Sequence, residues 1–149
     1  MAYGLANYRS EIFAAVASVS GTMLDCTATP EHPMPVIHLH GTADDTLPYD
    51  GNNYYKGAQT VLNHWIAFNN TNSSPTVTSD TSGSMAIERY VYDQGDAGVA
   101  VTHYKYIGGG HHWFTASYQG EDTARLIWDF VSQYDICLLY TSPSPRDLS

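Results

Sequence analysis

The sequence predicts an α/β fold in which helices flank a mostly parallel sheet. Short apolar runs of strand length recur along the chain, and segments with apolar residues at helical spacing lie between them. The runs at 13–20 and 35–40 consist mainly of apolar and small residues, as is typical of strands buried on both faces of a parallel sheet. With 149 residues, 43% of them hydrophobic, the chain is long enough for one domain with its own core.

The N-terminal part is expected to contain one helix and two strands. Apolar residues at helical spacing predict a helix that is already under way at Met1. Two buried strands are expected at 13–20 and 35–40, each followed by a glycine. The segment 22–34 between them contains prolines and is expected to be a loop.

The middle of the chain is expected to form a loop, a helix and a second loop. Residues 41–52 are rich in aspartate, glycine and proline, which favours turns. Roughly 53–68 should form a helix, because its apolar residues share one face: Ala58, Val61, Leu62, Trp65 and Ile66. Residues 69–84 are rich in Asn, Ser and Thr and are expected to be a surface loop.

The last third supplies two further strands and a final helix. Strands are expected at 87–92 and 99–107, with a Gly-Asp turn between them. The glycine-rich segment 108–113 should form a sharp loop, and an amphipathic helix is expected at roughly 121–134. The alternation of elements, with no internal repeat, favours a single α/β domain.

The two ends of the sequence look unlike the ends of a natural domain. Residues 137–147 (CLLYTSPSPRD) back-translate to the reverse-read arm of a widely used sequencing adapter. We therefore expect 137–149 to be translated adapter outside a fold of residues 1–136; a natural Ser/Pro-rich tail is the alternative. The helical spacing at Met1 indicates an internal methionine, so we expect the chain to be truncated.

Composition excludes several classes of function. The net charge is -9, from 6 basic and 15 acidic residues, so neither a nucleic acid nor an anionic membrane is an expected partner. No apolar run approaches the length of a membrane span. The two cysteines, Cys26 and Cys137, are too few for a disulfide scaffold or a four-cysteine zinc site.

Chemical side chains follow two of the expected strands. Asp44 lies in the loop after the strand 35–40, and His111 follows three glycines after the strand 99–107. In open α/β sheets, catalytic groups gather at the carboxyl ends of the strands. A carboxylate can hold a histidine in the tautomer that takes a proton from a hydroxyl nucleophile. The order Asp then His is that of an α/β-hydrolase triad, so Asp44 and His111 are the candidate catalytic residues.

Three strings resemble the polyhydroxybutyrate depolymerase and feruloyl esterase family of α/β-hydrolases. They are VIHLHGTADDTLPYDG (36–51), IGGGHHWF (107–114) and LIWDFVSQYD (126–135). That family shows HGTxDxxVPY around its triad aspartate and GGGHxW around its triad histidine. The resemblance covers about residues 1–136 and implies the C-terminal half of an α/β-hydrolase fold. It also implies a secreted serine esterase without a cofactor, acting on polyhydroxyalkanoate-type or hydroxycinnamoyl esters.

The sequence departs from the family pattern in several places. Leu47 stands where the family has valine, and Phe114 where it often has proline. No G-x-S-x-G motif occurs in the sequence, and Ser18 and Ser20 lack suitably spaced glycines. The opening MAYGLA resembles the segment that comes after the family's nucleophile. We therefore expect the serine and the oxyanion hole to precede Met1, and the chain as given to be inactive.

Several neighbouring residues have competing interpretations. Asp44 could simply cap a turn, and Asp45 is the alternative acid. Trp113 and Tyr49 are candidate substrate-binding residues, although core packing is an equally good interpretation of both. His112 is a third candidate at the rim of the substrate pocket or on the surface.

A metal site is considered and not expected. His38 and His40 share one face of a strand and could join His111 and His112 around zinc, but buried histidines more often serve packing and hydrogen bonding. Cys26 is interpreted as a small loop residue rather than a nucleophile. Two other functions remain open: a serine peptidase of the prolyl-oligopeptidase type, and a non-catalytic metal- or carbohydrate-binding module. A half-sheet with unpaired edges is also expected to fold poorly alone.

Overall fold

The computed structural model describes residues 1–141 and has an α/β fold, which confirms the predicted class. A five-stranded sheet runs in the order β1-β2-β5-β4-β3. The elements are α1 (Ala2–Tyr8), β1 (Val16–Val19), β2 (Val36–Gly41), α2 (Ala58–Asn69), β3 (Thr76–Ser82), β4 (Met85–Tyr92), the 3-10 turn η1 (Asp96–Gly98), β5 (Val101–Ile107), α3 (Thr123–Val131) and α4 (Ile136–Thr141).

The sheet is mixed rather than mostly parallel. β1, β2 and β5 are parallel, whereas β4 is antiparallel to both β5 and β3. The cause lies in the connections, because a parallel pair needs a crossover of a dozen or more residues. β2 and β5 are separated by a long segment that includes α2, but only the short turn η1 separates β4 from β5.

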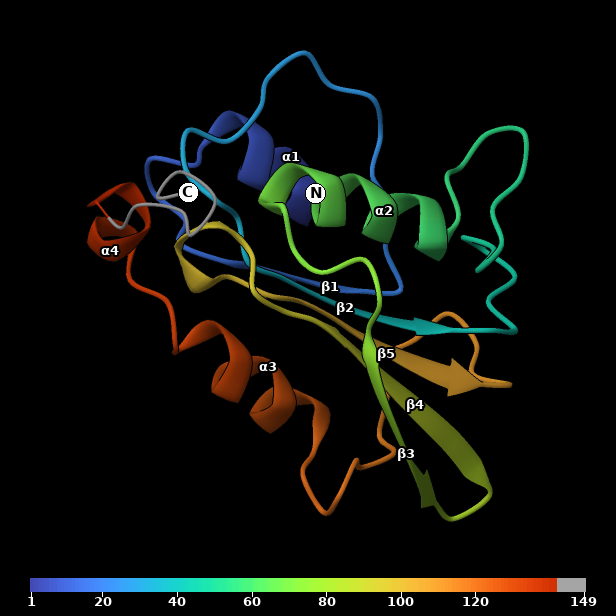
Figure 1. The fold of residues 1–149 in the computed structure, drawn as a ribbon. Helices are drawn as coiled ribbons and strands as arrows, with labels where there is room; N and C mark the ends of the chain where they lie inside the picture. Colours follow the sequence, from blue (N-terminus) through green and yellow to red (C-terminus); the bar gives the residue numbers. More distant parts are fainter. Residues whose placement is uncertain (142–149) are drawn as a thin grey trace.

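Helices cover both faces of the sheet, in three layers (Figure 1). α1 and α2 lie on one face and α3 on the other. Each side has its own apolar cluster, and in both the strand residues are almost fully buried. The first cluster includes Val36, Val61, Leu62, Trp65 and Val101. The second includes Ile37, Leu39, Ile87, Tyr106, Phe114 and Leu126.

The prediction of a surface loop over 69–84 is wrong, because the second half of this segment is the strand β3 (Thr76–Ser82). Most of β3 is exposed, so it shows no apolar alternation. Polar contacts hold it in place: the hydroxyls of Thr78 and Tyr118 lie 2.6 Å apart, and the Gln119 amide donates to Asp80. Gly83, with φ 60°, opens the two-residue turn to β4, as a type II′ hairpin turn requires.

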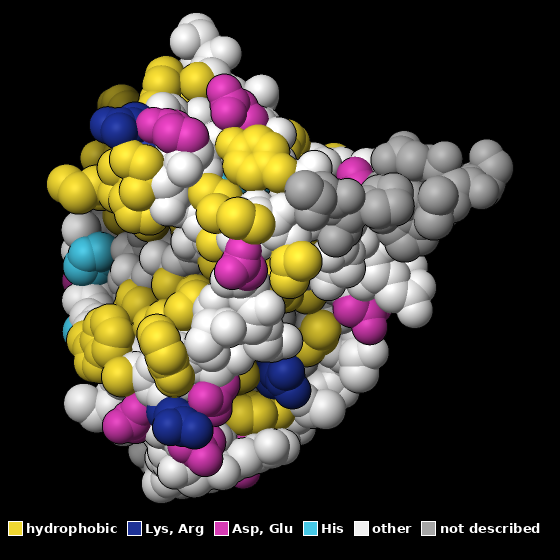
Figure 2. All heavy atoms as spheres, turned by 90° about the vertical axis from the view of Figure 1, so that its left-hand side faces the viewer, with side chains coloured by type: hydrophobic (Ala, Val, Ile, Leu, Met, Phe, Trp, Pro, Cys, Tyr) yellow, Lys and Arg dark blue, Asp and Glu magenta, His cyan; other side chains and the backbone are white. Residues whose placement is uncertain are grey.

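Both edges of the sheet are open in the described part of the chain. β1 pairs only with β2, and β3 pairs only with β4. Apolar side chains near the N-terminus are also uncovered: Met1, Leu5, Tyr8 and Ile12 are between 39% and 101% exposed. Figure 2 shows apolar side chains lying open among scattered charged ones on the face turned to the left in Figure 1. Open edges and uncovered apolar surface are the features that promote association with other chains.

The C-terminal segment that we expect to be translated adapter begins inside α4 (Ile136–Thr141). Leu139 is 4% exposed in this helix, and the Tyr140 hydroxyl donates to the Glu31 carboxylate. The first residues of this segment therefore contact the body of the molecule. The rest of the expected tail, 142–149, lies outside the described residues.

Candidate active site

The loops after β2 and β5 bring Asp44 and His111 together. The parallel strands β1, β2 and β5 end at the same edge of the sheet, and both loops leave from that edge (Figure 1). The His111 Nδ1–H donates to Asp44 Oδ2 at 2.9 Å. Both side chains therefore reach one point, although 67 positions separate them in the sequence.

Backbone contacts fix the two loops to each other. The Ala43 amide donates to the Gly109 carbonyl at 2.9 Å, and the Gly108 amide donates to Thr42 Oγ1 at 2.7 Å. A Cβ at Gly41 would lie 2.1 Å from the Gly109 carbonyl oxygen, so only glycine fits there. The glycine that follows HLH in the sequence is thus required by the close approach of the two loops.

Asp44 is a buried carboxylate whose oxygens have different partners. The residue is 5% exposed. Its Oδ1 accepts from the amides of Thr46 at 2.9 Å and Leu47 at 2.8 Å, while Oδ2 faces His111 and His40. Burial alone would raise the pKa of this carboxyl, but the Leu47 amide, His111 and the Thr46 amide outweigh burial and lower it. Asp44 is therefore ionised at neutral pH.

The turn-capping and histidine-orienting interpretations of Asp44 are compatible, because each uses a different oxygen. The alternative acid, Asp45, is exposed and accepts only from the Thr46 hydroxyl, at 3.3 Å, in the described residues. The geometry thus favours Asp44 over Asp45 as the partner of His111.

His111 has the arrangement of a general base. An ionised carboxylate can only accept, so the contact with Asp44 assigns a proton to His111 Nδ1. Nε2 of the neutral ring then carries a lone pair. The side chain is 37% exposed, so a substrate or a hydroxyl can reach it. Within residues 1–141, no hydroxyl group is hydrogen-bonded to this ring.

Two hydroxyl-bearing residues that contact the loops after β2 and β5 have other partners than His111. Ser20, at the end of β1, has φ 52° and is 5% exposed. Its hydroxyl donates to the His112 carbonyl at 3.2 Å. Thr42 Oγ1 accepts from the Gly108 amide. Neither residue is positioned as the nucleophile for His111 in the described part of the chain.

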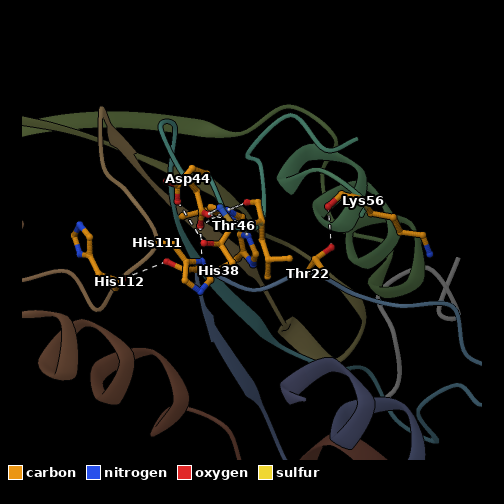
Figure 3. Close-up of polar contacts among 11 residues, drawn as sticks. Thr22, His38, Asp44, Thr46, Lys56, His111 and His112 are labelled. Atoms are coloured by element: carbon orange, nitrogen blue, oxygen red, sulfur yellow. Dashed lines mark hydrogen bonds and ion pairs between the residues drawn. The ribbon is translucent and has the colours of Figure 1, made fainter. Parts of the chain in front are cut away.

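The three candidate substrate-binding residues have different environments. Trp113 is 56% exposed and free to contact a ligand. The exposed His112 ring points away from the Asp44 cluster and packs against Phe114 with centroids 5.0 Å apart (Figure 3). The Tyr49 hydroxyl lies 2.8 Å from His103 Nε2, which places Tyr49 against a buried cluster rather than on an open rim.

Tyr49 contacts a group of three buried histidines. Two of them share a face of one predicted strand, but the sequence does not show that the third lies beside them. His38, His40 and His103 are each at most 2% exposed. Strand register places His103 directly opposite His38, a relation that the sequence alone does not give. Burial lowers the pKa of His38 well below its usual value and that of His103 to about 4, so both are neutral.

Residues 1–141 contain no group of three or more His, Cys, Asp and Glu side chains arranged to hold a metal ion. His38 Nε2 lies 3.1 Å from His40 Nδ1, so these nitrogens face each other rather than a common ion. His112 points away from them (Figure 3). The four histidines considered as zinc ligands in the sequence are therefore not gathered around one point.

A cavity of about 330 Å³ lies between α3 and the sheet, lined by residues that include Arg89, Tyr104 and Phe130. None of the candidate site residues lines it. It is therefore separate from the Asp44–His111 pair and does not correspond to the substrate pocket expected near Trp113.

Comparison with known proteins gives an informative similarity. No protein-family model matches the chain. Over 124 residues the chain is 31% identical to the bifunctional acetylxylan esterase/xylanase XynS20E of Neocallimastix patriciarum. The matched segment is 83% of this chain but only 17% of that protein. No helix in the described part of the chain is long and apolar enough to cross a membrane.

Proposed function

We propose that this chain is part of a serine hydrolase that cleaves carboxylic esters, with Asp44 and His111 as two members of its triad. The observation that carries the proposal is the 2.9 Å contact between a buried, ionised carboxylate and the Nδ1 of a part-exposed histidine. The two loops come from the carboxyl ends of parallel strands, where such groups act in α/β enzymes. Similarity to a bifunctional acetylxylan esterase/xylanase supports the same class of reaction.

In this proposal Asp44 and His111 each have a defined role. His111 Nε2 takes the proton of a serine hydroxyl as its oxygen attacks the ester carbonyl. The resulting tetrahedral intermediate collapses to an acyl-enzyme, and His111 gives its proton to the departing alcohol. Water then attacks the acyl group with His111 again acting as base, which frees the acid and restores the serine. Asp44 stays ionised and stabilises the imidazolium that forms in each half of the cycle.

The nucleophile in this proposal lies outside residues 1–149. The sequence contains no G-x-S-x-G motif, and residues 1–6 resemble the segment after that motif in the depolymerase and feruloyl esterase family. The amide of the residue after the serine usually contributes to the oxyanion hole, so that group would also be supplied from outside. Residues 1–149 alone are then expected to lack esterase activity.

The proposed substrates are esters of small or polymeric acids, with no cofactor and no nucleic acid or membrane partner. Polyhydroxyalkanoate-type and hydroxycinnamoyl esters are implied by the family resemblance. The name of the similar fungal protein adds acetyl esters of xylan. Extracellular action is proposed on the same grounds, since polymeric substrates of this kind are met outside the cell. Trp113 is exposed and lies two positions after His111 in the sequence. It is the residue that we propose to contact the substrate.

The test begins with the coding sequence upstream of Met1 and an assay on p-nitrophenyl butyrate. The proposal predicts an in-frame G-x-S-x-G shortly before Met1, and a longer protein that hydrolyses the ester and loses activity in His111→Ala. The matched control is His64→Ala, which removes an exposed histidine on α2, outside the candidate site. Residues 1–149 should show no activity above their own His111→Ala variant. Activity in 1–149 that depends on His111 would contradict the placement of the nucleophile.

A further inference from the structure

A line of buried polar side chains leads from α1 to the carboxylate of Asp44. The Tyr3 hydroxyl lies 2.6 Å from His38 Nδ1, and His38 Nε2 lies 3.1 Å from His40 Nδ1. His40 Nε2 lies 3.2 Å from Asp44 Oδ2. Tyr3, His38 and His40 are each at most 2% exposed, so the line is shielded from bulk solvent. None of the steps proposed for ester hydrolysis uses these three residues.

The acceptors at the Asp44 end fix which atom carries a proton. His40 Nε2 is 2.9 Å from the Leu47 carbonyl oxygen as well as 3.2 Å from Asp44 Oδ2. Both of these oxygens can only accept, so His40 Nε2 must carry a hydrogen. In the neutral form of the ring, Nδ1 then has a lone pair. This assignment rests on the chemistry of the two partners and not on a choice of tautomer.

The same reasoning applies to the next two residues of the line, His38 and Tyr3. His40 Nδ1 accepts, so His38 Nε2 must donate to it across 3.1 Å. His38 Nδ1 then accepts, and the Tyr3 hydroxyl donates to it across 2.6 Å. Burial raises the pKa of Tyr3 well above its usual value, so its proton is retained. All three donors therefore point in one direction, toward Asp44.

We propose that Tyr3, His38 and His40 form a donor chain that positions the Asp44 carboxylate for its work with His111. The proposal rests on the function proposed above, in which Asp44 orients the base. A carboxylate offers about four lone-pair sites. In this arrangement the amides of Thr46 and Leu47 fill those of Oδ1, and His111 donates to Oδ2. The single Nε2 hydrogen of His40 is bonded to the Leu47 carbonyl and lies against Oδ2, with His40 Nε2 3.2 Å from that oxygen.

Two consequences arise for the site. The carboxylate cannot rotate without losing a donor, so Oδ2 keeps facing His111 through the catalytic cycle. The chain also connects the acid to α1, since Tyr3 lies in the segment that resembles the one after the family's nucleophile. A shift of α1 would then alter the position of the Asp44 carboxylate, because His38 and His40 connect the two. Tyr3, His38 and His40 are positioning residues, because none of them contacts a reacting atom.

His103 provides an internal control for this assignment. Its Nδ1 lies 2.8 Å from the His38 carbonyl oxygen, so Nδ1 carries the hydrogen and Nε2 accepts from the Tyr49 hydroxyl. His103 thus has the opposite tautomer to its neighbours His38 and His40. It is equally buried and in the same cluster, but it makes no contact with Asp44 in the described residues.

The first test is to determine the histidine tautomers in the chain 1–149 by long-range ¹H–¹⁵N correlation NMR near neutral pH. The expected result is a proton on Nε2 of His38 and His40, and on Nδ1 of His103 and His111. A proton on Nδ1 of His38 or His40, or an imidazolium at His40, would overturn the proposal. This measurement needs no variant and no enzymatic activity.

The second test compares two substitutions of His40 by following the Asp44 carboxyl carbon through a pH titration. His40→Phe removes the Nε2 hydrogen that is bonded to the Leu47 carbonyl and lies against the ionised Oδ2, so the pKa of Asp44 should rise. His40→Gln keeps an amide donor at a similar distance and should show a smaller rise. His103→Gln, the matched control, should leave the pKa of Asp44 unchanged. An unchanged value in His40→Phe would contradict the proposal.

Tyr3→Phe covers the case in which the His40 variants fail to fold, because it removes only one oxygen. Without the Tyr3 donor, His38 should show a mixture of its two neutral tautomers in the same spectrum. A His38 that keeps a single Nε2–H tautomer in Tyr3→Phe would show that Tyr3 does not set the direction of the chain.

The outcomes separate this inference from the proposed function. If the longer protein has no esterase activity while the tautomers are as expected, the donor chain stands and the function fails. If His40→Phe lowers kcat with KM unchanged, and His40→Gln restores part of it, both stand. If the tautomers differ from those expected while the longer protein has full esterase activity, the donor chain is contradicted and the proposed function stands.

Discussion

Two histidines associated with β5 show how surroundings decide a side chain's chemistry. His103 lies within the strand, 2% exposed, between a backbone carbonyl and the Tyr49 hydroxyl. His111 lies just beyond the end of the strand, 37% exposed, with an ionised carboxylate at Nδ1. Both have a proton on Nδ1, yet only His111 offers a free, accessible Nε2. The difference is one of exposure and partner charge, not of residue type.

The largest effect is expected from a substitution that removes the charged partner of His111. In a longer protein that contains the nucleophile, Asp44→Asn should lower kcat on the order of 10⁴-fold, because an amide no longer favours the Nδ1–H tautomer or stabilises the imidazolium. The measurement is steady-state hydrolysis of p-nitrophenyl butyrate. The control is Asp45→Asn, which changes an exposed neighbour without touching His111. Retention of activity within tenfold in Asp44→Asn would rule out the assigned role.

The pH dependence of the free energy of unfolding should distinguish the buried His103 from the Asp44–His111 pair. Burial lowers the pKa of His103 to about 4, below its unfolded value of about 6.5, so the unfolded chain binds the extra proton first. The contribution of His103 to stability is then complete above about pH 6.5 and falls by about 3 kcal/mol as the pH drops toward 4, and His38, whose pKa is also lowered, acts in the same direction. Asp44, whose pKa is lowered, contributes stability that is lost only at still lower pH.

Urea unfolding at a series of pH values measures this dependence. His103→Gln should reduce the fall between about pH 6.5 and 4, while His32→Gln replaces a buried histidine outside the cluster and serves as the control. A curve that is the same in His103→Gln and in the unmodified chain would contradict the assignment of a neutral, buried His103.

A smaller effect is expected from the hydroxyl that completes the His103 environment. Tyr49→Phe leaves His103 Nε2 without a donor, which should lower the free energy of unfolding by about 1–2 kcal/mol. Tyr54→Phe, at a residue 83% exposed, is the control and should change little. Urea denaturation gives both values. If Tyr49→Phe were neutral in stability, an interpretation of Tyr49 as a substrate-binding residue would gain support.

The smallest predicted effect lies in β3, the edge strand that β4 separates from β5. Thr78→Val removes the contact with the Tyr118 hydroxyl and should cost about 1 kcal/mol of stability. Thr76→Val changes the same residue type on the same face of β3 and should cost less. Equal effects of the two substitutions would show that the Tyr118 contact does not stabilise the hairpin.

The parts of the fold that could be predicted are those with an apolar signal. β2 and β5 are buried runs, and α2 and α3 carry apolar residues on one face, so their existence can be inferred from periodicity. β3 lacks that signal, since it is held by pairing and by polar contacts such as Thr78 with Tyr118. Its β-branched threonines and the Gly83 turn are the local indications of a hairpin.

The site was predictable where it depends on single loops and not where it depends on strand register. Asp44 and His111 each follow a strand, and their motifs place them at one edge of the sheet. The association of His38 with His103 and of Tyr3 with His38 requires knowing which strands and helices are neighbours. The antiparallel direction of β4 is indicated in the sequence only by the short connection from β4 to β5, which is too short for a parallel crossover.

The most direct test of the central claim is to treat the longer protein and the chain 1–149 with a fluorophosphonate probe, and to locate the label by mass spectrometry. Such probes attach to a serine hydroxyl that a triad histidine activates. We predict labelling of the longer protein on a serine that precedes Met1, abolished in His111→Ala, and no labelling of 1–149. Label on a serine within 1–149, or label that persists without His111, would contradict the assignment of Asp44 and His111 as part of a serine hydrolase triad.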